Sequence, residues 1–314
     1  MLSLLGGIYL GWSLGANDAS NVFGTAVSSR MIKFWTAALL ASFFVIAGAV
    51  ISGRPGIETL KGLTPFKLEH AVIISVAAAL TVTIMTVLAL PVSTSQAVIG
   101  GILGIGILNE QIDLGGLAKV VFCWIGTPIG AALIAVCTYY VLGKIYNYLN
   151  FTIFTSDILI RTGMIMAGSY GAYAMGANNV ANVTAVFVGA GMLTVFYAAV
   201  IGGASIALGI LTFSRPVMQT VGKRLIDLDP FSALIVVLSL AITVHIYALI
   251  GVPVSTSQAV IGGVLGIGII KGVNTISRKT LRQILIAWSL TPIIACFLAL
   301  IIYFAIHLRY MPHN

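Results

Sequence analysis

A cluster of hydroxyl and amide side chains occurs twice in this chain. The decapeptide Pro-Val-Ser-Thr-Ser-Gln-Ala-Val-Ile-Gly at 91–100 returns letter for letter at 253–262, embedded in apolar sequence. Proline is favoured in the first turn of a helix, so each copy predicts a helix start with hydroxyls and free backbone N–H groups, where the helix dipole attracts anions. Two copies that face one another predict a site for a tetrahedral oxyanion. The candidate residues are Ser93, Thr94, Ser95, Gln96, Ser255, Thr256, Ser257 and Gln258.

The competing interpretation is that these hydroxyls only hydrogen-bond helices to one another inside a membrane. A single copy would favour that interpretation. The similarity extends over seventeen residues from Pro91 and Pro253, with Ile102/Val264 as the one difference. Such near identity favours a shared site that both copies build.

A second duplicated motif offers oxygen ligands for a small cation. Gly-Ala-Asn-Asp at 15–18 is matched by Gly-Ala-Asn-Asn at 176–179, and each is followed by a further Asn. Carboxylate and amide oxygens are hard ligands, and a carboxylate within an apolar segment is by default functional. Gly15 and Gly176 would let the backbone break or pack closely. A local helix cap is the alternative. The candidate cation ligands are Asp18, Asn21, Asn179, Asn182, Gln96 and Gln258.

The two motifs together predict cation-coupled anion transport. The predicted core contains one carboxylate, Asp18, and no Lys or Arg. A doubly charged anion is repelled by a carboxylate at low dielectric unless another charge compensates. Bound cations that bridge Asp18 and the anion would supply that charge.

Composition places both motifs in a membrane. The chain of 314 residues is 59% hydrophobic and 8% charged, against about 25% charged in soluble domains. Long stretches without Asp, Glu, Lys or Arg predict about ten segments of the length that spans a bilayer. They must be helices, because lipid offers the backbone no hydrogen-bond partner. The net charge of +8 lies in short loops and therefore reflects membrane topology, with no nucleic-acid partner expected.

The order of motifs repeats along the chain, which predicts two repeats at 1–150 and 151–314. The first half contains Trp124 and Thr127-Pro128, and the second half contains Trp288 and Thr291-Pro292 at the corresponding positions. Loop charge indicates opposite orientations. The loop after the first segment is basic in the first half and uncharged in the second, whereas the loop after the Pro motif changes from acidic to basic. We expect an all-α integral membrane protein with two inverted-topology repeats, whose broken or re-entrant helices meet at a midplane site.

Loop charges also predict the orientation of the chain. Five crossings per half and an external N-terminus place eleven Lys and Arg in the cytoplasm and five outside, in accord with the positive-inside rule. Both termini are then extracytoplasmic. A re-entrant hairpin at the Pro motif would change the number of crossings, and the sequence leaves that choice open.

The duplicated motifs resemble those of the inorganic phosphate transporter (PiT) family, the sodium- or proton-coupled phosphate symporters, over nearly the whole chain. The resemblance implies a symporter in the plasma or inner membrane that carries phosphate with sodium ions, as a homodimer and without a resident cofactor. It implies that residues 93–96 and 255–258 line the phosphate site and that Asp18, Asn21 and Asn182 serve the cations.

One departure from the family pattern concerns the coupling ion. Family members usually carry Asp in both copies of the first motif, whereas this chain has Asn179 in the second. A lone Asp18 favours sodium over a proton relay. A proton-coupled phosphate permease or a sulfate permease of the same fold is the alternative. A passive anion channel is disfavoured by Asp18, and a membrane enzyme by the lack of a nucleophile, base and metal set.

Overall fold

The computed structural model describes residues 2–63, 65–87, 92–224, 228–272 and 278–308. The described residues form helices only, apart from turns and short extended segments. In chain order the α-helices are α1 (Leu5–Ser28), α2 (Phe34–Ser52), α3 (Arg54–Lys61), α4 (Leu68–Val87), α5 (Thr94–Asn109), α6 (Leu114–Tyr148), α7 (Ile153–Gly189), α8 (Val195–Arg224), α9 (Pro230–Ile250), α10 (Thr256–Lys271) and α11 (Arg278–Leu308). A short 3-10 turn, Leu2–Leu4, precedes α1.

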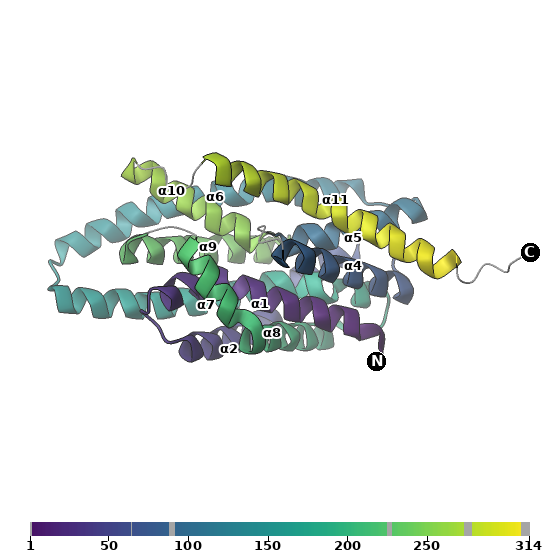
Figure 1. The fold of residues 1–314 in the computed structure, drawn as a ribbon, viewed down its shortest axis with the longest axis horizontal. Coiled ribbons are helices and arrows are strands. Elements are labelled where there is room, and N and C mark those ends of the chain that lie inside the picture. The colour runs from purple at the N-terminus through teal and green to yellow at the C-terminus, as the bar shows by residue number, and fades with distance from the viewer. Residues whose placement is uncertain (1, 64, 88–91, 225–227, 273–277, 309–314) are drawn as a thin grey trace, which may run out of the picture.

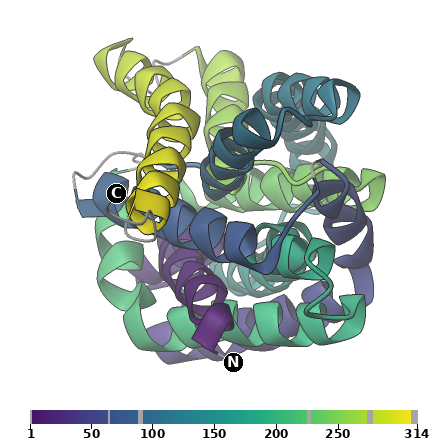
Figure 2. The ribbon, with the colours of Figure 1, turned by 90° about the vertical axis from the view of Figure 1, so that its right-hand side faces the viewer.

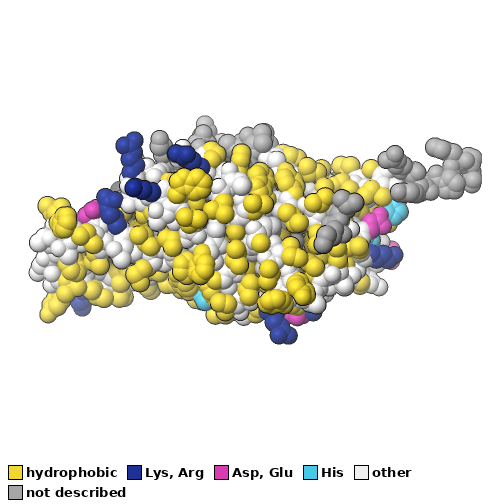
Figure 3. All heavy atoms as spheres, turned by 90° about the horizontal axis from the view of Figure 1, so that it is seen from below, with side chains coloured by type: hydrophobic (Ala, Val, Ile, Leu, Met, Phe, Trp, Pro, Cys, Tyr) yellow, Lys and Arg dark blue, Asp and Glu magenta, His cyan; other side chains and the backbone are white. Residues whose placement is uncertain are grey.

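The surface of the bundle is that of a membrane protein. Six helices (α2, α4, α6, α8, α9 and α11) contain stretches long and apolar enough to cross a bilayer. Large apolar side chains such as Phe43 and Phe122 are 66% and 74% exposed. Figure 3 shows apolar side chains over most of one face of the molecule. Lipid chains are the solvent that such a surface requires.

The two halves of the chain exchange helices. α1 packs on α8, and α7 packs on α2 in the same way. A methyl group on Gly15 would lie 1.9 Å from the Ile206 carbonyl oxygen, and one on Gly176 would lie 2.0 Å from that of Val45. These glycines therefore serve close helix packing. Neither glycine breaks its helix, since α1 and α7 run without interruption through the Gly-Ala-Asn motifs, so close packing is the one of the two expected uses that is observed.

Each Pro motif lies at the tip of a hairpin of two helices that turns back near the middle of the molecule. α4 packs on α5, and α9 packs on α10. Figure 1 shows the α9–α10 hairpin in the left part of the molecule and the α4–α5 hairpin in the right part, with their tips directed toward the centre. The second hairpin also packs on α6 of the first half, and α5 packs on α11. The expected ten crossings count both arms of each hairpin, and the hairpin shape corresponds to the re-entrant alternative that the sequence left open.

The ends of the molecule differ. One end, here called the α3 end, contains α3, the start of α1 and the end of α11, and it faces the viewer in Figure 2. The opposite end, here called the basic end, contains the turns around 29–33 and 149–152. There Arg161 donates to the Met31 carbonyl oxygen at 2.9 Å, and Lys271 pairs with Asp229.

α3 covers the tip of the second hairpin from the α3 end. Its side chains Ile57 and Leu60 are fully buried. Gly251, with φ +82°, begins the hairpin tip, and a methyl group there would lie 3.0 Å from the Pro55 carbonyl oxygen. The corresponding segment of the second half begins at Arg215-Pro216, as α3 begins at Arg54-Pro55, but it forms the end of α8 and not a separate helix. Met218, at the position that corresponds to Ile57, is also fully buried.

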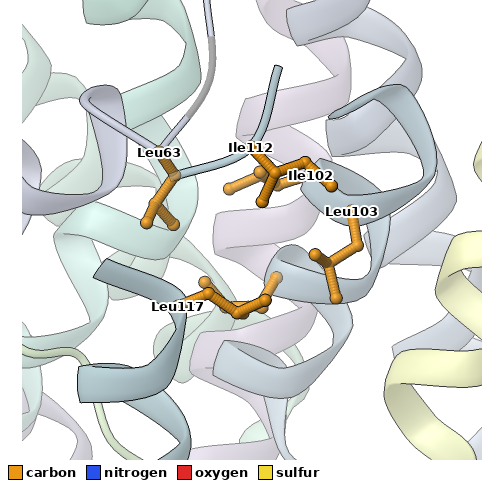
Figure 4. A pocket seen from close by; sticks show the side chains of 6 residues that line it. Leu63, Ile102, Leu103, Ile112 and Leu117 are labelled. Carbon is orange, nitrogen blue, oxygen red and sulfur yellow. The ribbon is translucent and has the colours of Figure 1, made fainter. Parts of the chain in front are cut away.

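A small apolar hollow lies beside α5 at the α3 end (Figure 4). Its lining comes from α5, the start of α6 and the loops before them. The side chains are Leu63, Ile99, Ile102, Leu103, Ile112 and Leu117. Because none of these side chains is polar, the hollow offers nothing to an ion.

Candidate functional site

The duplicated hydroxyl motifs form the starts of α5 and α10. Ser93 and Ser255 are the N-caps, and their hydroxyls accept the backbone N–H of Gln96 at 3.4 Å and of Gln258 at 3.3 Å. This is the usual work of a serine N-cap. Pro253 lies two residues before the cap and not in the first helical turn as expected. Pro91 lies outside the described residues.

The two hairpin tips bond to each other by a reciprocal pair of hydrogen bonds. Ser95 Oγ donates to the carbonyl oxygen of Val254 at 3.0 Å, and Ser257 Oγ donates to that of Val92 at 3.2 Å. Both serines are the second residue of their helix, two positions after the cap. The pair brings the two copies of the motif together at the centre of the molecule, as the sequence predicted.

Asn178 holds the second tip against α7. Its Nδ2 donates to the Val254 carbonyl oxygen at 2.8 Å, and its Oδ1 accepts the Val254 N–H at 2.8 Å. Asn178 was absent from the predicted site, although it belongs to the duplicated Gly-Ala-Asn motif. Its repetition in that motif was the signal that could have identified it.

Asp18 lies in the middle of α1 and contacts the second half of the chain. Its side chain is 4% exposed. Asp18 Oδ2 accepts hydrogen bonds from Thr256 Oγ1 at 2.8 Å and from Asn179 Nδ2 at 3.0 Å. No ion pair among the described residues involves it. Two neutral donors therefore satisfy a buried carboxylate, and the helix-cap alternative for Asp18 is wrong.

The other predicted cation ligands surround this carboxylate. Asn182 Nδ2 donates to Ser95 Oγ at 2.9 Å and to Asn179 Oδ1 at 3.1 Å. Asn21 Nδ2 donates to Thr256 Oγ1 at 3.2 Å. These amides connect α1 and α7 to both hairpin tips. The structure thus brings the predicted anion ligands and the predicted cation ligands into one cluster.

Four buried oxygen atoms of these motifs have no hydrogen-bond partner among the residues that the structure describes. Each of the four side chains is at most 5% exposed. The atoms are Thr94 Oγ1 (5%), Gln96 Oε1 (5%), Gln258 Oε1 (3%) and Asn182 Oδ1 (1%). Buried polar atoms in native proteins are almost always paired, so unpaired ones indicate a missing ion, water or substrate. Neutral oxygen donors of this kind fit an alkali cation and, for the hydroxyl, an oxyanion.

The chain as a whole is similar to proteins that are named as phosphate or sulfate transporters. The phosphate transporter family matches it twice, over residues 14–155 and 154–299. A protein named a phosphate permease in Methanocaldococcus jannaschii is 31% identical over 96% of both chains. A sulfate permease of Bacillus subtilis is 30% identical, covering 94% of this chain and 84% of its own.

A solved structure shares the fold. It is described as the sodium-dependent phosphate transporter, and it superposes with a TM-score of 0.85 over 98% of both chains at 22% identity. The double family match agrees with the two repeats seen in the helix packing. Transport, and not enzymatic catalysis, is what these relatives share. The chain is a multi-pass membrane transporter and belongs to the phosphate transporter family.

Proposed function

We propose that this protein is a secondary active symporter that moves inorganic phosphate into the cell together with sodium ions. Access to the central cluster alternates between the α3 end and the basic end. The observation that carries the proposal is the placement of Asp18, a buried carboxylate hydrogen-bonded to Thr256 at the start of α10. A helix start favours an anion, whereas the carboxylate favours a cation.

Electrostatics supports the coupling. At an effective dielectric constant of about 20, two like unit charges 4 Å apart repel by about 4 kcal/mol. Asp18 lacks a Lys or Arg partner within ion-pair distance among the described residues. An anion with two charges therefore needs accompanying cations to enter this cluster. Asp18, Asn21, Asn179, Asn182, Gln96 and Gln258 are the proposed sodium ligands.

The proposed phosphate ligands are the two sets of motif side chains. Thr94 and Thr256 stand at the first residue of α5 and of α10, next to the helix N-termini. Ser95 and Ser257 support them from the second position, while Ser93 and Ser255 cap the helices. The glutamine side chains offer either an amide donor or an acceptor oxygen.

The alternative is a proton-coupled phosphate permease or a sulfate permease of the same fold. One of the relatives is named a sulfate permease, so sulfate is the alternative substrate. Asn179 disfavours proton coupling. Family members usually have a second carboxylate at this position, and an amide cannot accept a proton in its place. Hydrogen phosphate can donate a hydrogen bond to an acceptor such as Gln Oε1, and sulfate has no proton to donate.

Labelled phosphate uptake into proteoliposomes tests the proposal. We expect an inward sodium gradient to drive uptake that excess sulfate leaves unchanged. Uptake driven by a proton gradient alone would show that the coupling ion is the proton and not sodium. Loss of phosphate uptake in excess sulfate would show that the site also takes sulfate. Unchanged cation dependence in Asp18→Asn would contradict the role given to Asp18.

The remaining parts of the proposal concern orientation and assembly. We place the α3 end outside and the basic end in the cytoplasm of the plasma or inner membrane, so both termini are extracytoplasmic. Counting a hairpin as two crossings or as none gives the same sides, since either number is even. We propose repeats at 1–150 and 151–314 and a homodimer in the bilayer.

A further inference from the structure

The two threonines at the helix starts are equivalent in sequence but differ in their contacts. Thr256 Oγ1 donates to Asp18 Oδ2 at 2.8 Å and accepts from Asn21 Nδ2 at 3.2 Å. Thr94 Oγ1 is buried and has no hydrogen-bond partner within the described part of the chain. The neighbouring serines, by contrast, keep their reciprocal bonds in both copies.

The cause of the difference is the single carboxylate. The counterpart of Asp18 in the second repeat is Asn179. Asn179 uses its Nδ2 on Asp18 at 3.0 Å, and its Oδ1 accepts from Asn178 at 2.8 Å and from Asn182 at 3.1 Å. Its side chain is committed to other partners, so Thr94 lacks the acceptor that Thr256 has.

The Asp18–Thr256 bond uses the donor that an anion would need. A hydroxyl group has one proton, and Thr256 directs it to a carboxylate oxygen. Hydrogen bonds to a charged acceptor are roughly twice as strong as those between neutral groups. Through this hydrogen bond Asp18 satisfies the start of α10 with negative charge from the protein itself.

We propose that Asp18 is an internal competitor for the Thr256 hydroxyl, and that a cation bound to Asp18 releases this hydroxyl to the transported anion. The inference rests on the proposed function and specifies how its cation and anion are coupled. Thr94 is available to the anion with or without the cation, whereas Thr256 becomes available only with it. By linkage, the anion strengthens cation binding by the same factor.

Equilibrium binding of inorganic phosphate to the purified protein, in sodium chloride or in choline chloride, tests this inference. Wild type should bind more tightly in sodium. Thr256→Val should weaken binding in sodium about tenfold, the value of one good hydrogen bond, and should lose most of the sodium enhancement. Thr94→Val should weaken binding about tenfold in both salts and keep the enhancement.

The matched pair separates competition from simple charge repulsion. Repulsion between Asp18 and the anion, relieved by sodium, would leave the enhancement equal in the two valine variants, and that result would overturn the inference. Asp18→Asn should raise the sodium-free affinity toward the wild-type value in sodium. Retained enhancement in Asp18→Asn would also overturn it.

Two controls keep the outcomes distinct. Absence of phosphate binding to wild type even in saturating sodium would contradict the proposed function, with sulfate tested in parallel as the alternative anion. Because valine has nearly the shape of threonine, both valine variants should remain monodisperse in detergent. Their comparison decides the inference even where Asp18→Asn does not fold.

Discussion

Asn178 fixes the backbone of a binding loop with a single side chain. Both ends of its amide bond to Val254, and Val254 also accepts the Ser95 hydroxyl that joins the hairpin tips. The start of α10 is therefore positioned from α7 and from α5 at once. A residue whose hydrogen bonds to the second tip are to its backbone can thus determine where the proposed anion ligands lie.

We predict that Asn178→Ala lowers the free energy of unfolding by about 1–3 kcal/mol, because the buried Val254 N–H loses its acceptor. Phosphate uptake should fall with it, since Thr256 stands two residues further on. Thermal unfolding in detergent and uptake into proteoliposomes measure the two effects.

Thr184→Val is the matched control on the same helix. Thr184 is equally buried, but its hydroxyl donates only to the Val180 carbonyl oxygen within α7, so its loss should cost less than about 0.5 kcal/mol. Equal losses in the two variants would show that Asn178 contributes no more than an intrahelical bond.

The residues of the candidate site were predicted from the sequence, but their hydrogen-bond partners were not. Duplication identified the residues at 93–96 and 255–258 and the carboxylate Asp18. Sequence spacing could not show that Ser95 bonds to the opposite tip or that Asp18 bonds to Thr256, because those contacts join residues 159 and 238 positions apart. Such distances in sequence are bridged only by tertiary packing.

Among the elements, the hairpin helices make backbone-to-backbone contact with the proline-containing helices of the opposite half. A methyl group on Gly262 would lie 2.2 Å from the Pro128 carbonyl oxygen in α6, and one on Gly100 would lie 2.2 Å from that of Pro292 in α11. The duplicated Thr-Pro segments and the duplicated glycines are therefore two sides of one interface, present twice.

We predict that Gly262→Ala destabilises the protein by about 1–3 kcal/mol and impairs transport, because the new methyl group forces α10 away from α6. Gly130→Ala, also in α6, is the control. Its nearest neighbour would be Thr243 Cγ2 at 4.0 Å, so the higher helix propensity of Ala should leave stability unchanged or raise it. Thermal unfolding and phosphate uptake are measured for both variants. Wild-type stability and uptake in Gly262→Ala would contradict the close contact between α10 and α6.

The base of the second hairpin is joined by a charged pair. Asp229 caps α9, and Lys271 ends α10. Burial raises the pKa of the Asp229 carboxyl, but hydrogen bonds from Lys271 and Ser232 outweigh burial and hold this pKa below its ordinary value. The bond from Ser232 Oγ is 2.7 Å long.

This pair should make stability depend on pH in acid. A lowered folded-state pKa means that the stabilisation is complete above the unfolded value of about 4 and is lost as pH falls through the lower folded value. We expect no more than about 1 kcal/mol, because both side chains are partly exposed. The difference in unfolding temperature between wild type and Asp229→Asn should shrink below pH 4. A constant difference from pH 6 to pH 3 would contradict it.

The helices themselves were predictable, whereas their turns in the membrane were not. Apolar length identified α2, α6, α8 and α11. α4 and α9 are about as long as α2 and comparably apolar, yet they turn back at the centre, where the opposite tip supplies hydrogen bonds to Val92 and Val254. Hydropathy does not register such partners. Likewise, Gly15 and Gly176 could have served a helix break or close packing. Their contacts with α8 and α2 show that they serve close packing.

At the scale of the whole molecule, the proposed orientation is open to direct measurement. We predict that Lys67→Cys, at the α3 end, reacts with an impermeant maleimide added outside intact cells. Lys33→Cys and Lys144→Cys, at the basic end, should react only after permeabilisation. Cys123, Cys137 and Cys296 are first replaced by Ala, because they are native thiols. The reverse labelling pattern would invert the orientation while leaving the fold unchanged.

The two halves pack helices against one another, and a repeat in the sequence cannot indicate this. Duplication predicts two similar units, but it does not say whether each unit packs on itself. Here α1 pairs with α8 and α6 with α10, so each half contributes helices that pack on the other. The boundary near residue 150 stays a prediction about the chain and does not describe a separable body.

α3 has a consequence for the balance of the transport cycle. Two identical inverted halves would give the forms open to either side equal free energy, and the empty carrier would spend equal time in each. α3 breaks this equality, because it is a separate helix with a turn before it, whereas the corresponding segment of the second half continues α8. The two ends of the molecule are therefore covered by differently built segments. We expect the empty protein to spend unequal times in its two forms, with the ratio set by the contacts in which α3 and the end of α8 differ.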